Sequence, residues 1–226
     1  MILALNNKCN LDKDEFIKYL NELNTIETTS TLILCPSTIN IPMFDSKKIL
    51  LGAQNVSKAE QGPHTGEVNA KQLSSYNVKY CIVGHSERRI EYNETNKEIN
   101  KKIKRLQREK IIPILCIGET LEERRNKTYK RVISKQIREC LINIGNIDDI
   151  IIAYEPVYSI GTGLTPTKEE IVEIVKLIKK KLPNNKILYG GSVNNSNKDM
   201  LSRIDLDGYL VGNLGLRIED LKEFLK

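Results

Sequence analysis

Several polar and ionisable side chains follow short apolar runs of the sequence, where they could act together on one substrate. Asn6 and Lys8 come after the first run, His85 and Glu87 after the fourth, and Glu155 after the sixth. A glutamate, a histidine, a lysine and an asparagine that converge on one point can transfer a proton next to a carbonyl group. Each also has a plainer interpretation, because Lys8 and Glu87 could form an ordinary ion pair and a strand-end histidine is often structural.

Glycine-rich segments follow the later apolar runs and indicate a ligand that carries a phosphate group. Gly161 and Gly163 come after Glu155, the segment 190–192 follows the seventh run, and Gly212 with Asn213 follows the eighth. Glycines let backbone N–H groups approach an anion closely, and the loops after strands seven and eight of a barrel commonly bind phosphate. No segment matches the P-loop or a complete GxGxxG pattern, which argues against a nucleotide. An ordinary turn at 161–163 stays the alternative.

The elements that must position these groups alternate along the chain. Apolar runs with little polar alternation are typical of parallel strands buried on both faces, and eight occur here, at 2–5, 31–35, 49–54, 80–83, 112–117, 150–154, 186–189 and 209–211. Segments of helical period lie at 12–23, 95–106, 129–142, 167–181 and 218–225, whereas the connection 36–48 is too short and proline-rich for a long helix. Thr167 and Glu170 have the spacing of a capping box.

This alternation predicts an α/β protein, a single-domain (β/α)8 barrel over residues 1–226. A doubly wound open sheet uses the same alternation and is the alternative. In a barrel the carboxyl ends of all strands open on one face, which would bring the polar groups together.

Composition excludes several other classes of function. Hydrophobic residues make up 40% and charged residues 28%, and no apolar stretch approaches the roughly 18 residues of a membrane span. The net charge of +6 is spread over helical segments, so no nucleic-acid partner is expected. The five cysteines show no metal-ligand spacing and the N-terminus has no secretory pattern, so we expect reduced thiols and a cytoplasmic location.

Six separate motifs then identify a family. They are GAQN at 52–55, TGE at 65–67, VGHSERR at 83–89, CIGET at 116–120, AYEPVYSIGTG at 153–163 and YGGSVN at 189–194. In these motifs and their order the chain resembles the triosephosphate isomerase family along nearly its whole length. The resemblance implies the TIM barrel fold and the interconversion of dihydroxyacetone phosphate and D-glyceraldehyde 3-phosphate, a step of glycolysis and gluconeogenesis.

The resemblance also implies a role for each residue of the predicted site. Glu155 is expected to be the base that moves a proton between adjacent carbons, and His85 to polarise the oxygens as a neutral imidazole, a pairing established for this family. Lys8 would add positive charge beside the enediolate, Asn6 would position its neighbours, and Glu87 would hold Lys8. No metal or organic cofactor is implied.

The family further implies a mobile lid at 156–165 that excludes water from the reaction. Ile160 and Leu210 are expected to press on Glu155, and Tyr189 with Ser192 to hold the closed lid. The expected phosphate and substrate contacts come from Asn6, Lys8, Gly161, Ser192, Gly212 and Asn213.

A homodimer follows from the same resemblance. Thr65 is expected at the tip of a loop that enters the partner subunit, and Cys9 at the interface, with a small packed hydrophobe as the alternative for Cys9. The chain departs from the family pattern at Tyr158, Leu164 and Asn213. Another phosphate-handling barrel enzyme and a catalytically idle barrel are the rival hypotheses.

Overall fold

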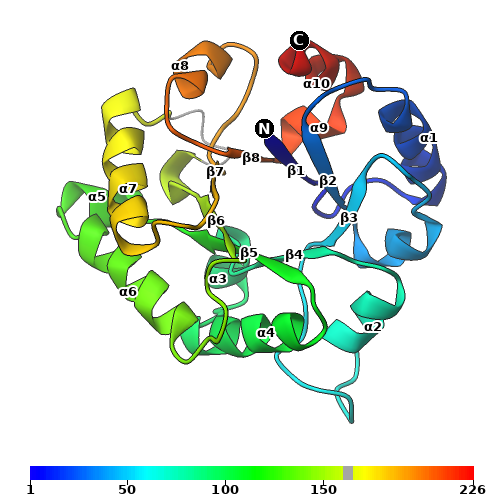
Figure 1. Cartoon of the computed structure of the whole chain (residues 1–226), viewed down its shortest axis with the longest axis horizontal. Helices are drawn as coiled ribbons and strands as arrows, with labels where there is room; N and C mark the ends of the chain where they lie inside the picture. Colours follow the sequence, from blue (N-terminus) through cyan, green and yellow to red (C-terminus); the bar gives the residue numbers. More distant parts are fainter. Residues whose placement is uncertain (160–164) are drawn as a thin grey trace.

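Eight parallel strands close into a barrel in the computed structural model, which describes residues 1–159 and 165–226 (Figure 1). Each strand pairs with the next, and β8 returns to pair with β1, where Ile2 lies opposite both Thr31 and Gly208. The strands are β1 Ile2–Asn6, β2 Thr31–Cys35, β3 Leu50–Ala53, β4 Tyr80–Val83, β5 Ile112–Ile117, β6 Ile151–Tyr154, β7 Ile187–Tyr189 and β8 Gly208–Val211. The predicted (β/α)8 barrel is confirmed, and the open sheet is excluded.

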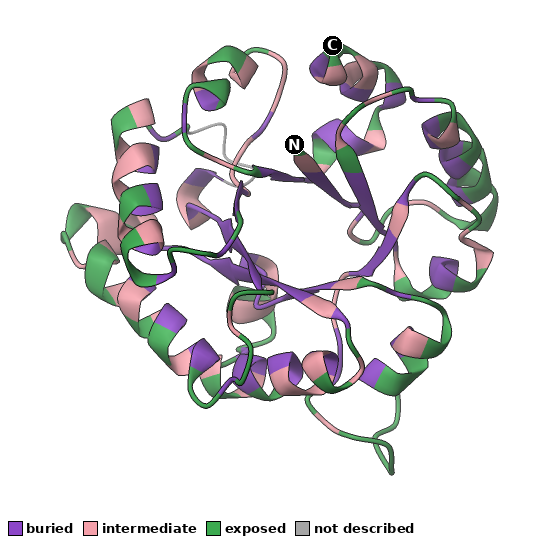
Figure 2. Ribbon diagram, viewed as in Figure 1, coloured by how far each residue is buried: buried purple, intermediate pink, exposed green. Residues whose placement is uncertain are grey.

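The strands are buried on both faces, as their continuous apolar runs predicted (Figure 2). Alternate residues such as Ile33, Ile82 and Leu188 fill the inside of the barrel. Their neighbours, such as Leu34, Val83 and Tyr189, point outward and pack under the surrounding helices. The barrel is therefore a packed core, and a ligand can reach only its ends.

The long helices begin and end close to the predicted limits. They are α1 Lys13–Asn24, α4 Asn96–Arg108, α6 Tyr129–Leu141, α7 Lys168–Lys181 and α10 Ile218–Leu225. Thr167 accepts the backbone N–H of Glu170, which completes the predicted capping box. The connection after β2 holds only a 3-10 helix, η1 Thr38–Met43.

One-turn and two-turn helices fill the loops around the strand ends, and the sequence did not predict them. They are α2 Ala70–Ser75, α3 Ser86–Glu91, η2 Val157–Ser159, α5 Leu121–Arg125, α8 Lys198–Ser202 and α9 Asn213–Leu216. Segments this short show too few apolar positions for a helical period to be visible. In the described part of the chain, no helix is long and apolar enough to cross a membrane.

Candidate active site

A pocket of about 250 Å³ opens at the carboxyl ends of the strands. Its walls include Asn6 at the end of β1 and Lys8 just beyond it, His85 and Glu87 after β4, and Glu155 after β6. The five groups that the sequence singled out for proton transfer therefore lie together in one cavity. Ser192, Leu210, Gly212 and Asn213 line the same pocket from the β7 and β8 side, whereas Ile160 and Gly161 lie outside the described residues.

Glu155 leaves the end of β6 with a side chain that is only 2% exposed. Its Oε2 accepts the backbone N–H of Ser86 at 3.0 Å, and its Oε1 lies 3.2 Å from Nε2 of His85. Oε1 has no hydrogen bond of good geometry to any described residue. One carboxylate oxygen is thus fixed by the backbone, and the other faces the His85 imidazole.

His85 is the N-cap residue of α3. Its Nδ1 accepts the backbone N–H of Glu87 at 3.3 Å, one of the N–H groups that the first turn of a helix leaves without a partner. Because Nδ1 is an acceptor in this contact, the proton of the uncharged ring lies on Nε2. His85 is 8% exposed at its side chain, so Nε2 is a donor held in a cavity beside Glu155.

Lys8 has a left-handed backbone with φ of 53°, which is uncommon for a residue other than glycine. The Oδ1 atom of Asn6 accepts the Lys8 N–H at 3.1 Å, and Gln54 donates to the Lys8 carbonyl at 2.9 Å. The Lys8 ammonium lies 2.6 Å from Oε1 of Glu87. The ion pair with Glu87 therefore exists, and it holds the ammonium at the pocket.

Asn213, one of the departures from the family pattern, lies on the β7 and β8 side of the pocket. Asn213 begins the short helix α9 and has no positive φ, so its backbone N–H does not depend on left-handed geometry. Tyr189 is fully buried in the outer core and does not line the pocket. Burial raises the pKa of Tyr189, and the neighbouring Ser159 side chain partly opposes that shift. Both hydroxyls lie close to Gly191, which lines the pocket.

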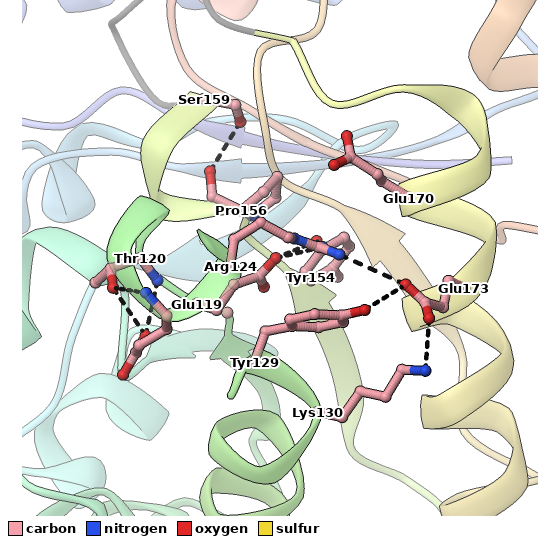
Figure 3. Close-up of polar contacts among 12 residues, drawn as sticks. Glu119, Thr120, Arg124, Tyr129, Lys130, Tyr154, Pro156, Ser159, Glu170 and Glu173 are labelled. Atoms are coloured by element: carbon pink, nitrogen blue, oxygen red, sulfur yellow. Dashed lines mark hydrogen bonds and ion pairs between the residues drawn. The ribbon is translucent and has the colours of Figure 1, made fainter. Parts of the chain in front are cut away.

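A buried polar network joins Glu119, Arg124 and Tyr154, the residue directly before Glu155, and sequence reasoning missed it (Figure 3). Glu119 is fully buried, and its Oε1 accepts the hydroxyl of Tyr154 at 3.1 Å. Arg124 pairs with Glu119 at 2.5 Å and donates to the Tyr154 hydroxyl at 3.1 Å. Burial raises the pKa of Glu119, and Arg124 opposes the shift. Burial also raises the pKa of Tyr158 to about 12, again opposed by Arg124.

An eight-stranded barrel with a buried carboxylate, an imidazole donor and an ammonium at its mouth defines an enzyme that moves protons on a small anionic substrate. The chain belongs to the triosephosphate isomerase family, since the family model described as triosephosphate isomerase matches residues 1–226. The members of this family are aldose-ketose isomerases.

Individual relatives agree with this assignment. A triosephosphate isomerase of Clostridium tetani is 39% identical, and one of Mesomycoplasma hyorhinis is 37% identical. Both alignments cover 97% of this chain and 93% of the relative. A triosephosphate isomerase of Mycoplasmopsis pulmonis is 41% identical over 85% of this chain and 80% of its own length.

Proposed function

We propose that this chain interconverts dihydroxyacetone phosphate and D-glyceraldehyde 3-phosphate as an isomerase of glycolysis and gluconeogenesis. The observation that carries the proposal is the pair of Glu155 Oε1 and His85 Nε2, which lie 3.2 Å apart in a cavity that Lys8 also lines. The reaction needs a base for a C–H proton and donors for the adjacent oxygen, and these groups supply both.

In this mechanism Oε1 of Glu155 takes the proton from one carbon of the substrate, because Oε2 is held by Ser86. Electron density moves to the neighbouring carbonyl oxygen, which becomes an enediolate oxygen. The Nε2–H of His85 and the ammonium of Lys8 stabilise this charge, and both are fixed before the reaction by contacts to Glu87. The hydroxyl proton of the first carbon is transferred to this enediolate oxygen through Nε2 of His85, and the first carbon becomes a carbonyl as Glu155 returns its proton to the adjacent carbon.

The phosphate group is proposed to bind on the β7 and β8 side of the pocket. Ser192, Gly212 and Asn213 line that side, and their backbone N–H groups are the expected donors. Lys8 and Asn6 extend the substrate site toward β1, and Leu210 is expected to shield Glu155 from water. The lid that the family implies includes residues 160–164, which the structure does not describe.

We also propose a homodimer in the cytoplasm. The loop between β3 and α2 extends away from the barrel (Figure 1) and carries Thr65, which is exposed. A second pocket of about 520 Å³ adjoins the active site and is lined by Cys9, Glu87 and Tyr92. Ile39 is 80% exposed, so an apolar side chain is available for burial by a partner.

The five cysteines are free thiols, which suits a reducing compartment.

The proposal is tested by a coupled assay for both directions of the triose phosphate reaction. Glu155→Gln should cost several kcal/mol of barrier, roughly a thousandfold or more in kcat, because the amide cannot accept the proton. Glu169→Gln, a change at an exposed residue of α7, is the matched control and should retain activity. Full turnover in the Glu155→Gln variant would exclude Glu155 as the base. An inactive wild-type protein would instead favour the hypothesis of an idle barrel.

A further inference from the structure

The backbone around Glu155 is held by the segment that follows β5. The N–H of Glu155 donates to the carbonyl of Ile117 at 2.8 Å, and the N–H of Val157 donates to the carbonyl of Glu119 at 3.0 Å. Gly118 lies so close to this strand end that a Cβ atom there would fall 1.6 Å from the Glu155 carbonyl oxygen. The residues 117–119 therefore fix where the backbone of Glu155 runs.

Glu119 holds the chain on both sides of Glu155. Its carbonyl binds Val157, and its carboxylate accepts the hydroxyl of Tyr154, the residue directly before Glu155. Tyr154 and Glu155 are neighbours in an extended chain, so their side chains point to opposite faces. Tyr154 is anchored outside the barrel while Glu155 points into the pocket. A displacement of the tyrosine ring would therefore move the backbone that carries Glu155.

Arg124 makes this arrangement possible, because a fully buried carboxylate is costly unless a cation pairs with it. Its guanidinium contacts both Glu119 and the Tyr154 hydroxyl. The same group lies 4.0 Å from the ring centre of Tyr129 on α6, and its Nη1 lies 3.6 Å from Glu173 on α7 (Figure 3). One planar cation thus joins α5, α6 and α7 to the end of β6.

We propose that Arg124 is a positioning residue for Glu155, acting through Glu119 and Tyr154, an inference that rests on the proposed function of Glu155 as the base. Proton transfer loses rate steeply when the reacting atoms are misplaced by about 1 Å. The proposed phosphate contacts of Ser192, Gly212 and Asn213 come from the β7 and β8 side, and none of these residues belongs to this network. Loss of Arg124 should therefore lower kcat and leave substrate binding nearly unchanged.

The test compares Arg124→Met and Arg124→Lys with Arg125→Met, a matched control at the exposed neighbouring arginine of the same helix. Arg124→Met should lower kcat about tenfold or more, whereas KM and the inhibition constant of inorganic phosphate stay within about twofold. Arg124→Lys should lose less kcat than Arg124→Met, because a lysine keeps the positive charge. It should still fall below the wild type, because an ammonium cannot contact all four partners as the planar guanidinium does. Arg125→Met should match the wild-type protein in all three constants.

Tyr154→Phe keeps the inference testable if Arg124→Met does not fold, because it removes only one hydroxyl. Tyr154→Phe should lower kcat about threefold or more. In the double variant with Arg124→Lys, the loss of kcat should be smaller than the product of the two single losses, because the two residues act through one network. Assays run well below the melting temperature of each variant separate positioning from loss of fold. Wild-type kcat in folded Arg124→Lys and Tyr154→Phe, or a raised KM with unchanged kcat, would overturn the inference. An inactive wild-type protein or an active Glu155→Gln variant would overturn the proposed function instead.

Discussion

Glu155 and His85 are both held by consecutive backbone N–H groups at the start of α3. The N–H of Ser86 donates to Oε2 of Glu155, and the N–H of Glu87 donates to Nδ1 of His85. These donors belong to the first turn of a helix, where they have no partner within the helix. One turn of backbone thus orients the carboxylate of Glu155, the proposed base, and the imidazole of His85 relative to each other.

His85→Asn should separate the cap from the catalytic donor. Asparagine is among the best N-cap residues, so α3 should begin at the same place and the protein should stay folded. The shorter amide does not reach the position of Nε2, so kcat should fall about a hundredfold. Steady-state kinetics and thermal unfolding measure the two effects. Thr95→Asn, an equivalent change at the N-cap of α4 outside the pocket, is the control. An unchanged kcat in His85→Asn would remove His85 from the mechanism.

The barrel and the grouping of the candidate catalytic residues in one pocket could be predicted from the sequence for physical reasons. Strands buried on both faces give continuous apolar runs, and all eight runs match strands to within about one residue at most ends. The carboxyl ends of barrel strands meet on one face, so Lys8, His85 and Glu155 could be placed together from their position after a run.

The supporting contacts could not be predicted in the same way. The Ser86 N–H that holds Glu155 is a backbone donor, and backbone donors have no signature in the sequence. Arg124 and Arg125 are adjacent in a charged segment, yet the Arg124 side chain is only 11% exposed and Arg125 is exposed. The difference in exposure between the two arginines depends on which strand and helices face each side chain. The periodicity of a five-residue helix is too short to show this.

Asn213→Asp should weaken substrate binding selectively. Asn213 lines the β7 and β8 side of the pocket, where the phosphate is proposed to bind. A carboxylate there would repel the phosphate by about 1 kcal/mol or more, which corresponds to a rise in KM of about fivefold or more. The rise should shrink with added salt, because the site is open to solvent ions. Asn213→Ser is the neutral control. An unchanged KM in Asn213→Asp would place the phosphate elsewhere.

Thr65→Glu and Ile39→Lys should each weaken the proposed dimer. Thr65 lies on the projecting loop, and Ile39 is 80% exposed, so a charge at either site would be buried at cost in a dimer interface. Sedimentation equilibrium should show a shift toward monomer at protein concentrations where the wild type is dimeric. Ile142→Lys changes another exposed isoleucine, at the end of α6, and should not shift the equilibrium. A monomeric wild-type protein would contradict the dimer itself.

Alkaline pH should destabilise the fold through the buried thiols. Burial raises the pKa of Cys35 from about 9 to about 12 and that of Cys140 to about 11. The folded protein therefore keeps these protons while the unfolded chain releases them above about pH 9. Ionisation of the thiols above pH 9 therefore stabilises only the unfolded chain. The contribution of the buried thiols to the free energy of unfolding is complete below pH 9 and is lost as pH rises toward 12.

Cys35→Ala tests this dependence at one residue. Removing the sulfur, which packs closely against Gly52, should cost roughly 1 kcal/mol of stability at neutral pH. Between pH 9 and 11, however, the free energy of unfolding should fall less steeply than in the wild type, by up to about 1.4 kcal/mol per pH unit. Urea unfolding at a series of pH values measures both. Cys35→Ser also lacks an ionisable thiol and should share the shallower slope. Equal slopes in all three proteins would mean that the Cys35 thiol does not couple to folding in this range.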